Sequence, residues 1–455
     1  MKDFKHLLLF AAILFAGLLP TACSSDDDEK TSERSFVIDE QVQNVEYEII
    51  TDKIVRADEL VDEAISRAGV AGSSEIQLLR TMFLSKQQDI ANAYAEQLGV
   101  SLAVMGFRSV SYAYWSVDER GEAIKLSARA LWGSCMTSQW NDIDPACIVL
   151  FPHYTITANS ESPSQSHTYE AIAACGDNLL ILPDYIGFGV AKDRTQPYIN
   201  HNLCAQNCID ALKAGYKVFR DLSEASLAET YKLCVVGASQ GGGNALAIHK
   251  WLDTHDGFAT DWRFDYSMCC AGPYSPTLTY DKYFELNSLA DPCVLPLTLQ
   301  AMRNVAPAYF EHLPESDFYT ADYAANHMAE MNQMITSKEY TTGEINAKFF
   351  EWYPAGGGHA VRLTDILSAE ALNTNSVLYE ALFKCLKEND LTQSWQPIHT
   401  INIYHDKSDD VVPYANAEAL QKAFPDKVVL TATNTGGGHT RSCLLWMVQL
   451  MSHKW

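Results

Sequence analysis

The chain has 455 residues, of which 47% are hydrophobic and 20% are charged, and its formal net charge at pH 7 is −24. This composition is ordinary for a globular protein and supplies enough apolar residues for a large core. The acidic excess argues against nucleic acid as a partner and against an anionic membrane surface, because phosphate groups would repel it. The length exceeds one average domain, but an α/β fold with an insertion reaches this size.

The N-terminal residues have the pattern of an export signal. Lys2 and Lys5 precede an apolar run over residues 7–19, which is too short for a comfortable transmembrane helix. The run ends in Leu-Pro-Thr-Ala-Cys, which resembles the lipobox of bacterial lipoproteins. By this resemblance residues 1–22 are a signal peptide and Cys23 becomes the lipidated N-terminus. The alternative is an ordinary cleaved signal peptide, and both imply a protein that works outside the cytoplasm.

Residues 23–40 are predicted to form an acidic linker. Their run Ser-Ser-Asp-Asp-Asp-Glu-Lys is similar to the tract that directs lipoproteins to the outer face in some Gram-negative bacteria. A plain solvated linker is an equally good interpretation of the same charges. The expected location is the outer membrane or the cell surface, on the periplasmic or extracellular side. The only membrane attachment expected is the lipid at Cys23.

Helices and a hairpin are predicted to open the globular part. Apolar residues at helical spacing predict helices over residues 56–69 and 74–99, the second with Ser74 as its N-cap. Residues 109–133 then alternate between apolar and polar and break at Asp-Glu-Arg-Gly-Glu, which predicts a β-hairpin.

Strands and helices alternate from there on. Strands are predicted at 146–151, 178–185, 231–237 and 264–272, and helices at 164–175, 201–222 and 240–255. Apolar strands joined by helical crossovers predict a parallel sheet that is covered on both faces.

An insertion is predicted to interrupt this rhythm. Residues 275–395 show helical stretches without a strand repeat, and they are predicted to form a cap or lid. The pattern then resumes with a strand at 399–410, a helix at 415–424, a strand at 427–434 and a short final helix at 444–453. The prediction is a core formed by residues 41–274 and 396–455, with the cap inserted between its two parts.

A nucleophile is predicted at Ser239, in the pattern Gly237-Ala-Ser-Gln-Gly241. A serine on a sharp strand-to-helix turn is lifted above the carboxyl edge of the sheet, and the small flanking residues allow close backbone approach. The N–H of the next residue, Gln240, is aimed at the oxyanion that develops during acyl transfer. The strand predicted before this pattern and the helix predicted after it strengthen the interpretation.

Serine needs a base and an orienting acid, and both are expected after strands later in the chain. The strand that begins at residue 399 ends in an acidic run, in which Asp409 is the preferred acid and Asp410 and Asp406 are the alternatives. The next strand leads into Gly-Gly-Gly-His439, where a flexible glycine loop would let the imidazole reach both partners. His359 ends an identical Gly-Gly-Gly-His run, but it precedes the acid and lies in the insertion, so His439 is the preferred base.

Together these residues resemble the α/β-hydrolase superfamily from about residue 109 to the C-terminus. The segments at 183–189 (PDYIGFG), 237–242 (GASQGG) and 405–413 (HDKSDDVVP) are similar to those of the secretory-lipase and esterase branch. The resemblance implies an α/β-hydrolase fold, with a mostly parallel sheet, helices on both faces and an inserted, mainly helical cap. It also implies that Ser239 is the nucleophile, Asp409 the acid and His439 the base.

Further site residues follow from the same resemblance. Related enzymes have His-Gly-Thr after the 146–151 strand where this chain has His-Tyr-Thr, so the backbone N–H of Tyr154 is expected to be the second oxyanion donor. Asp184 and Tyr185 are expected to brace the floor of the site or to contact substrate, and packing at the strand end is an equal alternative. His359 is expected to be a cap residue that could face the substrate pocket.

The expected activity is hydrolysis of carboxylic esters through an acyl-enzyme, with a small-molecule, lipid or glycan ester as substrate and without a metal or organic cofactor. A serine peptidase of the aminopeptidase type is an alternative, which would need acidic cap residues to hold a free amine. Glu285, Glu311 and Glu315 are the candidates for that role. A non-catalytic surface binding protein on the same fold is a third interpretation.

Overall fold

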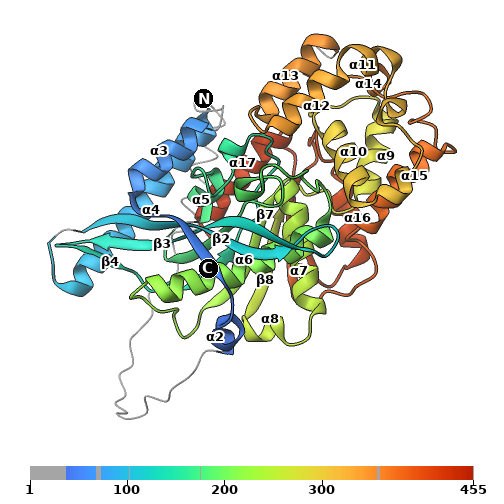
Figure 1. The fold of residues 1–455 in the computed structure, drawn as a ribbon. Helices are drawn as coiled ribbons and strands as arrows, with labels where there is room; N and C mark the ends of the chain where they lie inside the picture. The colour runs from blue at the N-terminus through green and yellow to red at the C-terminus, as the bar shows by residue number, and fades with distance from the viewer. Residues whose placement is uncertain (1–36, 68–72, 102, 175, 356–358, 454–455) are drawn as a thin grey trace. The chain divides into compact units, whose positions relative to one another are not determined.

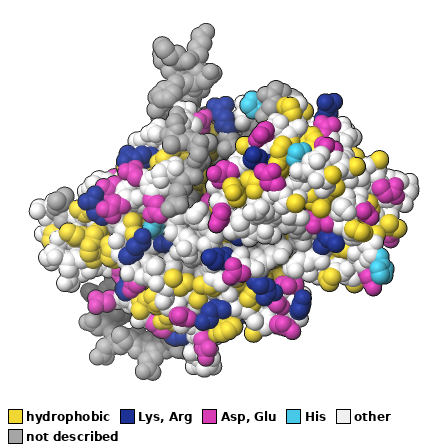
Figure 2. Space-filling view, turned by 45° about the horizontal axis from the view of Figure 1, so that its top comes forward, with side chains coloured by type: hydrophobic (Ala, Val, Ile, Leu, Met, Phe, Trp, Pro, Cys, Tyr) yellow, Lys and Arg dark blue, Asp and Glu magenta, His cyan; other side chains and the backbone are white. Residues whose placement is uncertain are grey.

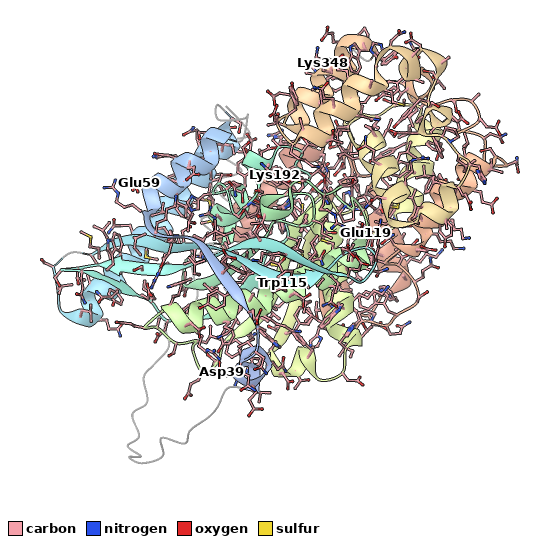
Figure 3. The ribbon with its side chains drawn as sticks, viewed as in Figure 1. Asp39, Glu59, Trp115, Glu119, Lys192 and Lys348 are labelled. Carbon is pink, nitrogen blue, oxygen red and sulfur yellow. The ribbon has the colours of Figure 1, made fainter. Side chains whose placement is uncertain are left out.

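The computed structural model describes residues 37–67, 73–101, 103–174, 176–355 and 359–453. The predicted signal peptide, Cys23 and most of the acidic linker lie outside these ranges. The end of the predicted linker is helical, because α2 spans Val37–Val42. Asp39 lies on α2 (Figure 3). It fixes α2 to helix α6 (His201–Leu222), because it accepts a hydrogen bond from the Tyr216 hydroxyl at 2.9 Å and pairs with Arg220 at 3.5 Å. The prediction of linker up to residue 40 is therefore wrong for these last residues.

A mixed sheet forms the centre of the fold (Figure 1). Within the described residues it has ten strands, in the order β1-β2-β3-β6-β5-β7-β8-β9-β10, with β4 paired to β3. Its strands are β1 (Tyr47–Arg56), β2 (Val104–Val117), β3 (Ala123–Met136), β4 (Trp140–Asp142), β5 (Cys147–Leu150), β6 (Asn178–Pro183), β7 (Lys232–Ala238), β8 (Phe264–Cys270), β9 (Thr400–Asp406) and β10 (Val428–Thr433). The pairs from β6 through β10 are parallel, and the pairs that involve β1 to β4 are antiparallel.

The predicted hairpin is the β2–β3 pair, and its turn falls at the polar break that predicted it. Edge strand β1 has no counterpart among the predicted elements. Most of its side chains are exposed, so its sequence lacks the alternation that burial of one face imposes. Only pairing with β2 makes this segment a strand.

Helices cover both faces of the sheet, as predicted. Helices α3 (Ala57–Arg67), α4 (Ser74–Leu98), α5 (Tyr169–Ala174) and α17 (Gly438–Met451) contact one another or the strands on one face. Helices α6 and α7 (Gln240–Thr254) pack together on the other face, with α2 and α8 (Phe258–Asp261) beside them. The N-cap of α4 is Ser73, whose hydroxyl accepts from the Ile76 N–H, and not Ser74 as predicted.

Helices also make up the segment between β8 and β9. They are α9 (Pro276–Leu286), α10 (Val294–Val305), α11 (Ala321–Asn326), α12 (Met328–Ser337), α13 (Thr342–Trp352), α14 (Leu363–Ile366) and α15 (Val377–Glu388). They surround an apolar cluster of their own, in which Tyr323 and Phe349 stack with ring centroids 5.8 Å apart. After β9, helix α16 (Ala415–Ala423) packs against α9 and β10. We call residues 275–395 the cap.

Charged side chains of both signs are interspersed over the face shown in Figure 2, so the acidic excess does not gather into one patch there. The described helices include none that is both long enough and apolar enough to cross a membrane.

Candidate active site

Ser239 occupies a strained turn between β7 and α7. Its backbone has φ = +56° and ψ = −126°, a region that residues other than glycine rarely adopt. A Cβ on Gly237 would lie 2.1 Å from the carbonyl oxygen of Gly241, and a Cβ on Gly241 would lie 2.3 Å from that of Pro152. The two glycines of the motif are therefore required by close backbone contacts.

The structure brings Ser239, His439 and Asp409 into one hydrogen-bonded row. His439 Nε2 lies 2.9 Å from Ser239 Oγ, and His439 Nδ1 lies 2.7 Å from Asp409 Oδ2. The other Asp409 oxygen, Oδ1, accepts the backbone N–H groups of Val411 at 3.0 Å and Val412 at 2.7 Å. These backbone bonds fix the carboxylate and leave Oδ2 for the imidazole.

The two alternative acids have other partners. Asp406 accepts from Ser408, from the Thr433 hydroxyl at 2.7 Å and from the Thr435 N–H at 2.8 Å, so it closes the end of β9. Asp410 accepts the backbone N–H of His439 at 2.9 Å and not its ring. Of the three carboxylates, only Asp409 contacts the imidazole.

His439 lies in the first turn of α17 and not on the glycine loop, because the helix begins at Gly438 instead of at the predicted residue 444. Two glycines here are left-handed: Gly436 of the loop, with φ = +69°, and Gly438, the first residue of the helix, with φ = +70°. These conformations turn the chain from β10 into the helix. The imidazole is therefore held by a helix and by two side-chain partners.

Neighbouring charges shift the pKa values of His439 and Asp409 in opposite directions. Burial on its own lowers the pKa of His439, but Asp409 and Cys443 raise it, and the pKa lies well above its ordinary 6.5. Burial raises the pKa of Asp409, but His439 and His405 lower it more strongly, so the carboxyl stays ionised. The pair is thus arranged to stabilise an imidazolium.

Cys443 is a neighbour of His439 that no sequence motif indicated. Its sulfur lies 3.9 Å from His439 Nε2 and 3.8 Å from Cys270 Sγ. The hydrogen bond from Cys270, together with His439, lowers the pKa of the Cys443 thiol against the effect of burial. Cys443 follows His439 by four residues, so a helix predicted to start at Gly438 would have placed them on one face.

The predicted oxyanion donors differ in their surroundings. Gln240 is the first residue of α7 and lines the same cavity as Ser239. The backbone N–H of Tyr154 instead donates to the Glu170 carboxyl at 3.3 Å, so the structure gives this predicted donor another partner. The next residue, Thr155, lines the cavity with Ser239 and Gln240.

Asp184 and Tyr185 are buried and bonded within the fold. Asp184 accepts from the Ser127 hydroxyl at 2.6 Å and from the Ser164 N–H at 2.7 Å. The Tyr185 hydroxyl donates to the carbonyl of His153 at 2.9 Å, and the two rings stack. Neither residue lines the cavity at Ser239. Their contacts are those of a brace and not of a substrate-binding site.

His359 is an exposed residue of the cap and does not line the cavity at Ser239. The three glycines before it lie outside the described residues. Of the two histidines that follow identical glycine runs, His439 thus contacts Ser239, whereas His359 is exposed on the cap.

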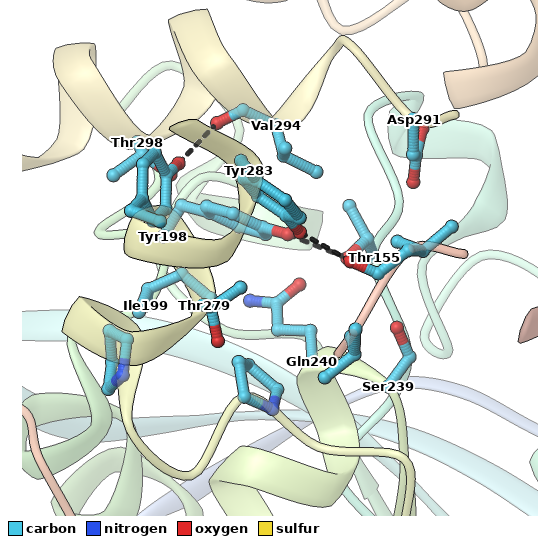
Figure 4. A pocket seen from close by; sticks show the side chains of 15 residues that line it. Thr155, Tyr198, Ile199, Ser239, Gln240, Thr279, Tyr283, Asp291, Val294 and Thr298 are labelled. Carbon is cyan, nitrogen blue, oxygen red and sulfur yellow. Dashed lines mark hydrogen bonds between the residues drawn. The ribbon is translucent and has the colours of Figure 1, made fainter. Parts of the chain in front are cut away.

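A cavity of about 30 Å³ opens at Ser239 (Figure 4). The core contributes Thr155 and Gln240 to its wall, and the cap contributes Tyr280, Tyr283 and further residues of α9 and α10. The wall is therefore largely aromatic and aliphatic. Ser239 thus lies at a largely apolar cavity that the core and the cap form together.

Comparison with solved structures identifies the fold. A ligand-bound form of the rice cell wall degrading esterase LipA from Xanthomonas oryzae matches with a TM-score of 0.65 and 16% identity, over 89% of this chain and 97% of that one. A Legionella pneumophila protein whose assignment as a hydrolase is provisional matches with a TM-score of 0.62 and 14% identity, over 90% and 96%. Candida antarctica lipase A in its closed state gives 0.50 and 14%, over 89% and 82%.

No protein-family model and no curated protein sequence matches the chain. At these identities the structural likeness establishes architecture and not activity. The mixed sheet with helices on both faces and a helical insertion matches its structural neighbours, and the chain has the α/β-hydrolase fold.

Proposed function

We propose that this chain is a serine hydrolase of carboxylic esters, with Ser239 as nucleophile, His439 as general base and Asp409 as the acid that orients it. The observation that carries the proposal is the row of contacts from Ser239 Oγ to His439 Nε2 (2.9 Å) and from His439 Nδ1 to Asp409 Oδ2 (2.7 Å). It begins at a strained serine on a strand-to-helix turn, which is the arrangement that activates a hydroxyl for acyl transfer.

The reaction proceeds in two halves. His439 Nε2 takes the Ser239 proton as Oγ bonds to the carbonyl carbon, and the imidazolium is stabilised by the Asp409 carboxylate. The tetrahedral intermediate then expels the alcohol, which receives the proton from His439, and an acyl-enzyme remains on Ser239. Water attacks the acyl-enzyme with His439 again as base, and the released acid restores Ser239.

The oxyanion is held by the N–H of Gln240 and by a donor from Thr155. Gln240 supports this role by its position at the start of α7, where backbone N–H groups have no helical partner. Thr155 supports it by lining the cavity beside Ser239. Tyr154 is set aside as a donor because its N–H is bonded to Glu170.

Short acyl groups are the proposed substrates. A cavity of about 30 Å³ holds only a few groups the size of a water molecule, each of which needs roughly 10–15 Å³.

The proposal for location rests on the sequence alone: the mature protein begins at a lipidated Cys23 and works outside the cytoplasm. Loss of membrane association in Cys23→Ser would support the anchor, and unchanged association would exclude it.

The test is a panel of p-nitrophenyl esters with acyl groups from acetyl to decanoyl, run on the wild-type protein and on Ser239→Ala. We expect the fastest turnover on the shorter esters and loss of nearly all rate in the variant. Labelling by a fluorophosphonate probe should occur in the wild type and disappear in the variant. Aminoacyl anilides run beside the esters separate an esterase from a peptidase. Ester hydrolysis that persists in Ser239→Ala would refute the assignment.

A further inference from the structure

One charged side chain, Asp291, lines the cavity at Ser239. It lies in the segment between α9 and α10, and it reaches into the cavity from the cap, with Ser239 and Gln240 on the opposite side (Figure 4). No lysine, arginine or histidine is among the described residues that line the cavity. Asp291 is half-buried, and its carboxylate has no cationic partner in the described part of this largely apolar wall.

One carboxylate oxygen of Asp291 accepts hydrogen bonds from the protein, and the other accepts none from the described residues. Its Oδ1 accepts from the Asn346 side-chain amide and from the Cys293 thiol, the latter at 3.3 Å. Asn346 also accepts the backbone N–H of Cys293 at 2.9 Å, so its position is fixed from both sides. Within the described part of the chain, Oδ2 has no hydrogen-bond partner. The carboxylate is therefore oriented by the cap while one oxygen is left for a ligand.

Gln240 supplies a second acceptor without a partner. Its side chain is 4% exposed and lines the cavity, and its Oε1 has no hydrogen-bond partner among the described residues. A buried amide oxygen without a donor is destabilising, because it has lost its hydrogen bonds to water. A buried amide oxygen without a partner and the half-buried carboxylate of Asp291 thus line the same small cavity.

The hydroxyl groups of the tyrosines in the cavity wall form hydrogen bonds within the protein, which fix the positions of the rings. Tyr198 shares a hydrogen bond with Thr155 at 3.1 Å, and Tyr283 donates to the Val411 carbonyl at 2.6 Å. Burial raises the pKa of both phenols, and the charge of Asp291 raises it further, so both lie within the field of the carboxylate. Their hydroxyls are thus engaged within the protein, and the wall offers ring surface to a ligand. Aromatic rings attract cations.

We propose that this cavity is a subsite for a primary ammonium group of the substrate, bound by Asp291 Oδ2 and Gln240 Oε1 against the tyrosine rings. An ammonium group carries three donors and no acceptor, which suits two free acceptors and an aromatic wall. It is about the size of a water molecule, whereas a trimethylammonium group is much larger than a cavity of about 30 Å³ allows. The inference rests on the proposed ester hydrolysis and names its substrate class: short esters that carry an amine.

The acidic residues predicted for such a role lie elsewhere. Glu285 and Glu311 have side chains that are 65% and 74% exposed, and Glu315 accepts from the Asn332 side chain. None of the three lines the cavity. Asp291 was missed because a single Asp-Pro in a predicted cap does not differ in sequence from an ordinary turn.

The experiment compares ester pairs that differ only by a terminal ammonium or methyl group. On the acyl side these are the p-nitrophenyl esters of β-alanine and of butyric acid, and on the alcohol side 3-aminopropyl acetate and butyl acetate. We expect the wild-type kcat/KM to favour the ammonium member of at least one pair by about tenfold or more, the effect of a hydrogen-bonded charge. Asp291→Asn, whose amide oxygen still accepts from Asn346, should remove that preference, and Asp291→Ser serves if the first variant does not fold.

Glu285→Gln is the matched control, because it neutralises an exposed cap carboxylate outside the cavity, and it should keep the preference. Calorimetric binding of the same ester pairs to Ser239→Ala gives a readout that does not need turnover. Equal rates and equal binding within both pairs would overturn the inference, as would a preference that survives in both Asp291 variants. Failure of the wild-type protein to hydrolyse any ester would refute the proposed function instead, and the binding comparison would still decide the subsite.

Discussion

Asp409→Asn tests how the row of contacts selects one form of the imidazole. In the wild type Oδ1 accepts two backbone N–H groups, from Val411 and Val412, and Oδ2 accepts from His439 Nδ1 at 2.7 Å. An asparagine must place its oxygen toward the two backbone donors, since its amino group would repel them. The amino group then faces His439 Nδ1 and donates to it.

This exchange reverses the tautomer of His439. Nδ1 becomes the acceptor, and the ring proton moves to Nε2, which faces Ser239 Oγ at 2.9 Å and can no longer accept its proton. The variant also loses the carboxylate charge that stabilises the imidazolium. In the Ser-His-Asp enzymes of the chymotrypsin type this change lowers kcat about 10⁴-fold, which corresponds to about 5 kcal/mol of transition-state stabilisation. We expect a loss of that order here.

The assay is steady-state hydrolysis of p-nitrophenyl butyrate by both forms, with urea unfolding to compare their stability. The asparagine keeps both backbone hydrogen bonds, so the free energy of unfolding should change by no more than about 1–2 kcal/mol. Asp410→Asn is the control, because Asp410 contacts only the backbone N–H of His439, and its loss should stay below about tenfold. A folded Asp409→Asn that keeps more than a tenth of the activity would refute the reasoning, and a larger loss in Asp410→Asn would move the acid to Asp410.

Three further outcomes are expected. His439→Ala should abolish ester hydrolysis, whereas His359→Ala, which removes an exposed histidine, should alter kcat/KM less than about threefold in the same assay; equal losses would contradict the assignment of the base. Because the free base must be neutral and the pKa of His439 lies well above its ordinary 6.5, kcat/KM on an uncharged ester should fall as the pH drops through a value above 6.5, and an acid limb below pH 6.5 would argue against this environment. Gly241→Ala should lower the free energy of unfolding in urea by about 2–3 kcal/mol, since its Cβ would lie 2.3 Å from the Pro152 carbonyl oxygen, and a stable variant with full activity would show that the turn relaxes at little cost.

Periodicity and local motifs predicted much of the architecture. Helix α6 begins and ends at the predicted residues, because its apolar residues recur at helical spacing and Asn200 caps it by accepting from the Leu203 N–H. The strand-to-helix turn at Ser239 was predictable because only glycine tolerates the backbone contacts at 237 and 241. Patterns of this kind involve residues that are close together in the sequence, so they can be recognised without the tertiary structure.

Segments with weak local patterns were missed or misplaced. Strand β1 is mostly exposed and becomes a strand only by pairing with β2. The start of α17 was predicted six residues too late, because three glycines in a row indicate a loop, whereas in the structure the Asp410 carboxylate accepts the backbone N–H of His439 in the first turn of the helix.

From the residues alone follow the order of most elements, the candidate nucleophile Ser239 and a short set of candidate acids and bases beside it. The tertiary structure alone decided which carboxylate meets the imidazole, because Asp406, Asp409 and Asp410 differ by one to four residues but point to different partners. Only the tertiary fold brings Asp291 of the cap to the cavity at Ser239, although Ser239 precedes it by 52 residues in the chain. Periodicity reports burial along one element, whereas a site is defined by side-chain directions that only packing between elements fixes.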